Sequence, residues 1–277
     1  MNDANRNLIV RIVSAVVLAV PLLFSLFWHR PEAILAWVLV AVVVGLGEFY
    51  WITLADDPVW LRVLGIVFGL GFSLLIYTRP FPDAPMVGLM AATLALSLAQ
   101  LFFHRDIKTA TSHAGLMLFG LLYVPLLLTS LALIKRFPSH GAEWIVLAMA
   151  TTWVADTGAY GVGRAIGKRK LYPAISPKKS IEGAVGGVFF ATLAGVVAKL
   201  WFLPVLTWVD VVLICVPGSI LGMTGDLVES MIKRGYGVKD SGKAIPGHGG
   251  LLDRIDALLF VAPYVYVYAH YVVLARG

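Results

Sequence analysis

The stretch 225–256 gathers acids, bases and glycines into one dense polar block. Three carboxylates, Asp226, Asp253 and Asp256, stand where this block meets apolar segments on either side. Lysines, arginines and glycines lie between them. Carboxylates hold Mg²⁺, cations hold phosphate, and glycines bring backbone N–H groups close to an anion. This combination of residue types is typical of phosphoryl-transfer chemistry.

The spacing of the acids predicts how they are presented. Asp226, Glu229 and Ser230 share one face if a helix continues through them. Asp253 and Asp256 are three residues apart at the start of the last apolar run. We expect two acid-bearing helix ends on the same membrane side to meet around one or two Mg²⁺ ions. Helix capping is the alternative role for Asp253 and Asp256, and it leaves Asp226 without one.

Two further segments carry candidate anion-binding groups. Lys178, Lys179 and Ser180 precede a new helix, whose N-terminus favours anions, so this segment resembles a triphosphate or headgroup clamp. An ordinary basic loop explains its charges but not its serines. In the segment 246–250, glycines allow positive φ and expose N–H groups toward an anion. His248 there is either a phosphate donor or acid, or a structural hydrogen-bonding group.

Composition places the chain in a membrane. Of its 277 residues, 59% are hydrophobic and 14% charged, against about 25% charged in soluble domains. The net charge of +6 is explained by loop cations that set orientation, so nucleic acid is not an expected partner. An acid within a span, such as Glu48 or Asp156, is costly unless it is paired or faces the protein interior, so a functional role is the first hypothesis for Asp156.

Runs of about 20 apolar residues indicate spanning helices. The sequence predicts an all-α integral membrane protein of about nine transmembrane helices, with two basic cytoplasmic loops forming the site. The expected spans are 8–28, 31–52, 59–77, 85–103, 113–134, 142–160, 183–203, 208–225 and 255–274.

Charge distribution predicts orientation and organisation. Lys and Arg are concentrated on the side that carries the N-terminus and the loops 161–182 and 226–254. The positive-inside rule places that side in the cytoplasm of a multi-pass protein of the plasma (inner) membrane. Polar residues are sparse before about residue 140. We therefore expect residues 1–140 to embed the chain and residues 141–277 to form the catalytic region.

The polar block resembles a known family pattern. The segment 230–256 is similar to the pattern of bacterial-type phosphatidate cytidylyltransferases (CDP-diacylglycerol synthases). The matching positions are Ser230, Lys233, Arg234, Lys239, Asp240, Pro246, His248, Gly249, Gly250, Asp253, Arg254 and Asp256. Segments 156–160, 176–180 and 225–226 also match what the family implies, whereas the N-terminal half matches only as a set of spans.

The resemblance implies a reaction and its participants. CTP and phosphatidate would give CDP-diacylglycerol and pyrophosphate in a Mg²⁺-dependent homodimer, with a second metal ion left open. Asp226 and Asp253 are the leading metal candidates, and Asp256 and Asp240 are further ones. The expected phosphate-binding and catalytic cations are Lys178, Lys179, Lys233, Arg234, Lys239 and Arg254. The expected orienting or substrate-binding groups are Ser180, Ser230 and Asp156, and His248 is expected to be an orienting and catalytic group.

Three other functions are compatible with parts of the sequence. A CTP-dependent lipid-alcohol kinase would use similar groups but release CDP rather than pyrophosphate. A transporter would need polar residues at several midplane positions in both halves, whereas here they cluster in one half. A structural scaffold would leave the paired acidic helix ends without a purpose.

Overall fold

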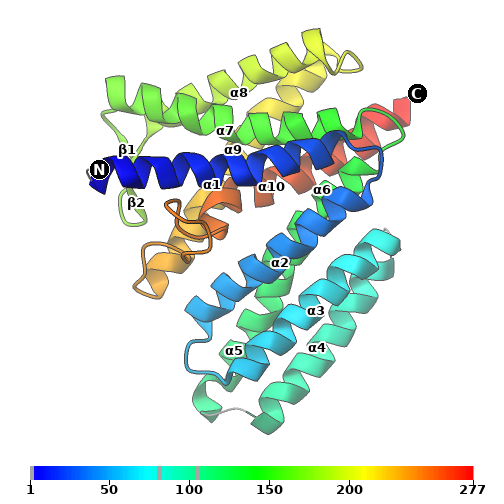
Figure 1. Cartoon of the computed structure of the whole chain (residues 1–277), viewed down its shortest axis with the longest axis vertical. Coiled ribbons are helices and arrows are strands. Elements are labelled where there is room, and N and C mark those ends of the chain that lie inside the picture. Colours follow the sequence, from blue (N-terminus) through cyan, green and yellow to red (C-terminus); the bar gives the residue numbers. More distant parts are fainter. Residues whose placement is uncertain (1–2, 80–82, 104–105, 277) are drawn as a thin grey trace. The chain divides into compact units, whose positions relative to one another are not determined.

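The structure is a computed structural model that describes residues 3–79, 83–103 and 106–276, with the side chains of 3–10, 12 and 84 outside the described part. It is almost entirely helical (Figure 1). The helices are α1 (Asp3–Phe27), α2 (Glu32–Thr53), α3 (Val59–Thr78), α4 (Asp83–Phe103), α5 (Ile107–Leu121), α6 (Leu127–Lys135), α7 (Gly141–Ile166), α8 (Ile181–Trp201), α9 (Trp208–Gly235) and α10 (Leu252–Tyr268). A π-helical turn, Leu122–Leu126, joins α5 to α6, and short π and 3₁₀ turns extend α10 to Arg276.

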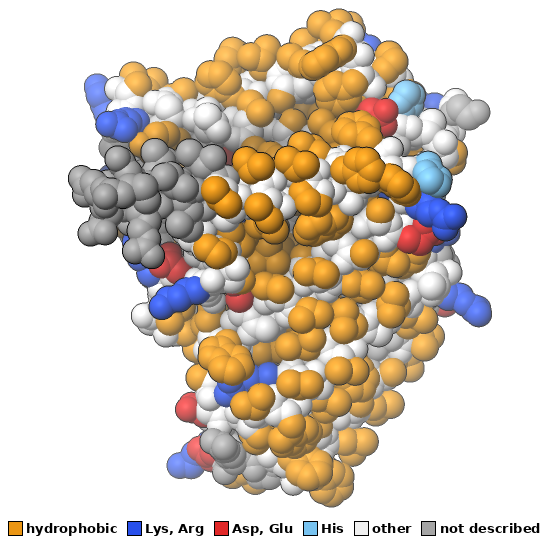
Figure 2. Space-filling view, viewed as in Figure 1, with side chains coloured by type: hydrophobic (Ala, Val, Ile, Leu, Met, Phe, Trp, Pro, Cys, Tyr) orange, Lys and Arg blue, Asp and Glu red, His pale blue; other side chains and the backbone are white. Residues whose placement is uncertain are grey.

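Helices occupy all nine expected spans. Seven are long and apolar enough to cross a membrane among the described residues: α2, α3, Pro85–Phe103, Ile107–Lys135, α8, α9 and Leu252–Arg276. Helix α1 contributes a shorter apolar segment, Val13–Phe27, because its expected span begins outside the described side chains. Helix α7 is absent from the seven because threonines and Asp156 dilute its apolar content. Hydrophobic side chains dominate the helical surfaces in Figure 2.

Contacts divide the chain into two compact units. Unit 1 comprises residues 1–133 and 236–254, and unit 2 comprises residues 134–235 and 255–277. The motif segment 236–254 therefore packs with the N-terminal helices. This division follows packing rather than function, so the predicted catalytic region 141–277 stays a prediction.

The core of unit 1 is built around Tyr50 of α2. Its ring is fully buried, and its hydroxyl donates to the carbonyl of Met117 at 2.8 Å. Gly65 of α3 and Gly120 of α5 face this ring, and a Cβ at either position would lie 2.6 Å from it. Small residues therefore let three helices close around one aromatic side chain.

Unit 2 contains a helix pair and a hairpin that the sequence did not predict. Helices α7 and α8 run side by side (Figure 1), and a Cβ at Gly158 of α7 would lie 2.5 Å from the ring of Phe190 in α8. Between them, β1 (Lys170–Tyr172) and β2 (Ser176–Ser180) form an antiparallel pair in which Lys170 lies opposite Ser180. The basic segment 161–182, expected as a loop, is thus ordered into a hairpin that leads into α8.

Candidate carboxylate site and motif loop

Glycines on α9 bring acid-bearing helices together in unit 2. A Cβ at Gly218 would lie 3.2 Å from Thr151 of α7. A Cβ at Gly225 would lie 2.5 Å from the carbonyl oxygen of Asp256 in α10. Backbones can approach this closely only where no side chain intervenes. Asp226, the next residue along α9, is thereby placed beside α10.

Asp226 has two direct partners in unit 2. The Lys179 ammonium lies 2.6 Å from Asp226 Oδ2, and the Ser230 hydroxyl donates to Oδ1 at 3.3 Å. The Ser230 contact confirms that the helix continues and that these two residues share a face, because α9 extends to Gly235 rather than ending near residue 225. Lys179 and Asp226 are both partly exposed, so the pair is accessible to a ligand.

Asp156 and Asp256 complete a group of acids around Asp226. Both carboxylates repel Asp226 electrostatically, and Asp256 also repels Asp156. Three acids from α7, α9 and α10 thus share a region, in which Lys179 attracts Asp156 and Lys233 attracts Asp256. Sequence spacing did not connect Asp156 with the metal candidates, since it is 70 residues from Asp226.

The donor set suits a hard divalent cation, because carboxylate oxygens are the ligands that Mg²⁺ prefers. Across the described ranges, no group of three or more His, Cys, Asp or Glu side chains is arranged tightly enough to enclose a metal. Lys179 pairs with Asp226 in this group. The carboxylates therefore fit a metal chemically, and the ligand group expected from the sequence stays a prediction.

The β hairpin and its junction with α8 hold Lys179 in place. The Ser180 hydroxyl accepts from the Gly183 N–H at 3.1 Å and caps α8. The Glu182 carboxylate accepts from the backbone N–H groups of Lys168 and Arg169. The predicted clamp residues thus divide their roles: Ser180 is a buried cap, Lys179 pairs with Asp226, and Lys178 is exposed.

The two cations at the end of α9 differ in their surroundings. Lys233 is 8% exposed and forms an ion pair with Glu229, one helical turn earlier. This contact gives Glu229 a cationic partner on its own helix. Arg234 is exposed. The structure therefore leaves Arg234 more accessible to a phosphate than Lys233.

Asp253 lies in unit 1, where it accepts hydrogen bonds from the motif loop, residues 239–254. Its Oδ2 accepts from the Ser241 N–H at 3.0 Å, the Gly250 N–H at 3.0 Å and the Ser241 hydroxyl at 3.1 Å. It stands in the first turn of α10, where a carboxylate is also stabilised by the helix dipole. Of the paired acids at the head of α10, only Asp256 belongs to unit 2.

Side-chain and backbone hydrogen bonds fix the loop tip 246–249. Gly247 and Gly249 have φ of 77° and 84°, which confirms the expected positive-φ glycines. Arg254 donates twice to the carbonyl of His248, at 2.7 and 3.0 Å. The His248 and Gly250 N–H groups bond to Ile245 O and Asp253 Oδ2, respectively. These two N–H groups therefore serve the loop instead of facing an anion.

Helix α1 contributes loop contacts that the sequence did not suggest. Arg11 Nε donates to Gly247 O at 2.9 Å, and the Ser14 hydroxyl lies 3.0 Å from Pro246 O and 3.2 Å from His248 Nδ1. Single polar residues in an apolar run carry no signal of a partner more than 230 residues away. On the other side of the loop, Lys239 and Asp240 are exposed, as a ligand-binding role requires.

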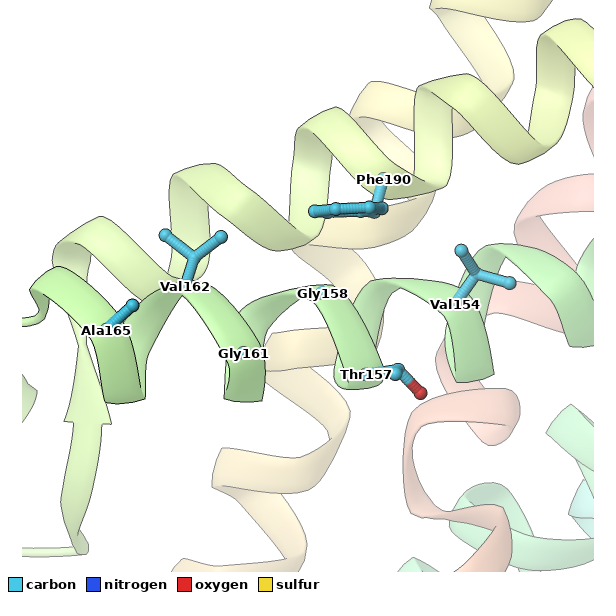
Figure 3. Close-up of a pocket in the computed structure, with 7 residues that line it drawn as sticks. All are labelled: Val154, Thr157, Gly158, Gly161, Val162, Ala165 and Phe190. Carbon is cyan, nitrogen blue, oxygen red and sulfur yellow. The ribbon is translucent and has the colours of Figure 1, made fainter.

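An apolar groove lies along α7 and α8, away from the acids. It is lined by Val154, Thr157, Gly158, Gly161, Val162, Ala165 and Phe190 (Figure 3). An α-helix turns by about 100° per residue, so Asp156 lies on the opposite face of α7 from Gly158 and Gly161. The groove is therefore separate from the carboxylate group.

Comparison with known proteins gives a consistent family assignment. Residues 9–272 match the model described as the cytidylyltransferase family. The chain is 44% identical over 133 residues to the phosphatidate cytidylyltransferase of Bacillus subtilis (strain 168), covering 48% of this chain and 49% of that one. It is 47% identical over 126 residues to the protein of the same name from Staphylococcus epidermidis (strain RP62A), covering 45% and 48%. The matched stretch spans about half the length of these relatives.

Proposed function

Because the chain belongs to the cytidylyltransferase family, as its motif predicted, we propose that it transfers the cytidylyl group of CTP to phosphatidate. The products would be CDP-diacylglycerol, a precursor in phospholipid synthesis, and pyrophosphate. Names of relatives support the lipid substrate, since the bacterial proteins at 44–47% identity are phosphatidate cytidylyltransferases. The observation that carries the proposal is the group of Asp156, Asp226 and Asp256 with Lys179 held against it.

The reaction needs positioning and charge neutralisation more than acid–base chemistry. An oxygen of the phosphatidate phosphate attacks the α-phosphorus of CTP, and the bond from that phosphorus to the bridging oxygen breaks. The electron pair leaves with pyrophosphate. A phosphate monoester is already anionic at neutral pH, so no strong general base is required, and the site must chiefly align two anions.

The residues of the carboxylate group divide this work. Asp156, Asp226 and Asp256 would hold Mg²⁺, which when bound offsets the charge of the triphosphate and of the leaving pyrophosphate. Lys179 would bind a phosphate oxygen. Its ion pair with Asp226 is partly exposed, so its ammonium group is available to an anion of higher charge, such as a triphosphate. Ser230 would keep Asp226 in one orientation through its hydrogen bond.

The same proposal includes where the protein acts. Seven helices of spanning length and composition in the described part of the chain, together with bacterial relatives, support a multi-pass protein of the inner membrane. We place its N-terminus and both basic segments in the cytoplasm, where CTP is made, on the charge bias of the sequence. A homodimer in the bilayer completes the proposal, and cross-linking in native membranes tests it.

Product analysis tests the reaction directly. Purified protein in detergent receives phosphatidate, Mg²⁺ and CTP labelled at the α-phosphate, and both lipid label and pyrophosphate are measured. We expect equimolar lipid label and pyrophosphate, abolished by EDTA and restored by excess Mg²⁺. Transfer of a γ-phosphate to a lipid alcohol with release of CDP would instead identify a lipid kinase. Absence of both products would overturn the enzymatic proposal.

A further inference from the structure

Glu48 of α2 is a buried acid without a role in the proposed reaction. It is 9% exposed and lies within a segment long and apolar enough to span a membrane. An unpaired carboxylate there would be costly, so its partners indicate what it does. Those partners lie about 200 residues away, in the motif loop of unit 1.

The Glu48 carboxylate accepts three hydrogen bonds from this loop. Its Oε1 accepts from the Leu251 N–H, and its Oε2 accepts from the Leu252 N–H and the Ser241 hydroxyl, all at 2.9 Å. Leu251 and Leu252 stand at the start of α10, where N–H groups have no partner within their own helix. Glu48 therefore caps α10 from another helix and closes the loop at Ser241.

Two glycines of the motif form the space that this carboxylate fills. A Cβ at Gly242 would lie 2.5, 2.8 and 2.9 Å from Oε1, Cδ and Cγ of Glu48. A Cβ at Gly250 would lie 2.7 Å from Glu48 Oε2 and would collide with Ser241 Oγ. Neither glycine has positive φ, so close contact, and not backbone conformation, accounts for the absence of a side chain at both positions.

Ser241 connects Glu48 to Asp253. Its hydroxyl lies 2.9 Å from Glu48 Oε2 and 3.1 Å from Asp253 Oδ2, and a hydroxyl has one proton to donate. The two carboxylates thus hold one serine between them, and each takes two further N–H donors from the loop. A change at Glu48 is therefore transmitted to Asp253 through a shared group.

We propose that Glu48 is a positioning residue that fixes the motif loop 239–254, and with it Lys239, His248 and Arg254, for the reaction. The inference rests on the proposed function for what the loop residues do, and on the contacts above for what Glu48 does. Glu48→Gln keeps the size of the side chain but replaces one of the two acceptor oxygens by an NH₂ group, which is a donor. That NH₂ group would face a loop N–H or hydroxyl that is itself a donor, so at least one hydrogen bond would be lost. The loop should then lose its fixed conformation.

Spin labelling tests this positioning without reference to activity. Ala244→Cys places a thiol on an exposed part of the loop, and the native Cys215 is buried. In the labelled protein, Glu48→Gln should shift the spectrum toward the mobile component. Glu32→Gln, an exposed acid on the same helix, is the matched control and should leave the spectrum unchanged. Equal spectra for both variants would overturn the proposal, whatever the enzyme's products are.

A double-mutant cycle distinguishes loss of the Glu48 contact from general misfolding of a variant. All three atoms nearest to a Gly242 Cβ belong to the Glu48 side chain beyond its own Cβ. Gly242→Ala should therefore raise label mobility when Glu48 is present and add nothing in a Glu48→Ala background. Additive effects of the two changes on label mobility would contradict the proposed contact between Gly242 and the Glu48 side chain.

Kinetics then separate positioning from general stability. If cytidylyl transfer is established, Glu48→Gln should lower kcat by about 10- to 100-fold, with the KM for CTP changed less than kcat. Loss of stability alone would lower the amount of active enzyme, but the remaining fraction would have normal KM and normal label mobility. That outcome would refute a positioning role.

Discussion

At the scale of single residues, the Lys179–Asp226 pair joins the predicted phosphate-binding segment 176–180 to the acids. Asp156 and Asp256 bring two further carboxyl groups to the same region of unit 2. Opposite charges 2.6 Å apart in a partly exposed site attract each other, but water and salt weaken this attraction. The value of the pair therefore lies in holding a cation beside the acids, more than in the stability of the fold.

Substitution of Lys179 tests that role. Lys179→Ala should lower kcat/KM for CTP by about 10- to 100-fold, since one charge-assisted contact to phosphate is lost. Lys170→Ala, an exposed lysine of the same hairpin, is the matched control and should act like the unmodified chain. Steady-state kinetics over a range of CTP concentrations distinguish the two. Equal losses in both variants would mean that only the net charge of the hairpin matters.

Residue types were predictable, but most of their partners were not. The shared face of Asp226 and Ser230 follows from helical spacing and is confirmed. The contacts of Asp226 with Lys179 and of Glu48 with Leu251 cross between helices, and spacing within one helix carries no information about them. Sequence reasoning therefore found the acids, whereas the hydrogen bonds that Asp253 accepts within the loop of unit 1 were not among its predictions.

At the scale of elements, glycines set the distances between the helices that carry the acids. Along α9, Gly222 and Gly225 face α10, and Gly222 also faces Thr152 of α7. Close backbone approach leaves little space to take up an added methyl group, because protein interiors are densely packed. The position of the carboxylates thus depends on residues that have no chemistry of their own.

An added methyl group at this contact should separate the helices. In Gly225→Ala, the Cβ would meet the backbone oxygen of Asp256 at 2.5 Å, which only a shift of α9 or α10 can relieve. We expect a destabilisation of about 1–3 kcal/mol together with reduced turnover. Gly235→Ala, on the same helix with open space around its Cβ, should have neither effect. Thermal unfolding in detergent and the transfer assay measure both.

The helices were predictable from apolar runs, whereas the C-terminal end of α9 and the hairpin were not. Helix α9 continues ten residues beyond its expected span because polar side chains do not stop a helix. Within this extension, Glu229 forms an ion pair with Lys233 one turn later, which stabilises the helix. The strand pair around Lys170 and Ser180 lacks the alternation of apolar and polar residues that marks a strand. The segment is rich in lysine and arginine, so its sequence pattern does not indicate a strand.

At the scale of the whole molecule, one continuous motif contributes to two units. Residues 230–235 and 255–256 belong to unit 2, and residues 236–254 belong to unit 1. Part of the motif therefore carries acids on helices, and part forms a loop that is stabilised by side chains of α1 and α2. A division of the chain at residue 140 by composition could not reveal this arrangement, since packing is not sequential.

Membrane topology is predicted at the same scale. A membrane-impermeant maleimide applied to cells with an intact inner membrane should label Val205→Cys and not Ala244→Cys. Val205 lies in the connection between α8 and α9, and Ala244 lies in the motif loop; both are exposed. Permeabilised membranes should give labelling of both, and the unmodified chain with its buried Cys215 is the background. Labelling of Ala244→Cys in intact cells would reverse the orientation.

The role of Asp226 is the central claim, and one comparison tests it most directly. Asp226→Asn keeps the shape of the side chain and removes the charge that Lys179 pairs with and that a metal would need. Cytidylyl transfer from α-labelled CTP should fall by at least about 10³-fold, with unchanged circular dichroism and thermal unfolding. Asp56→Asn, an exposed acid of unit 1, should retain full activity. Near-normal turnover of Asp226→Asn would contradict the assignment of the carboxylate group as the catalytic site.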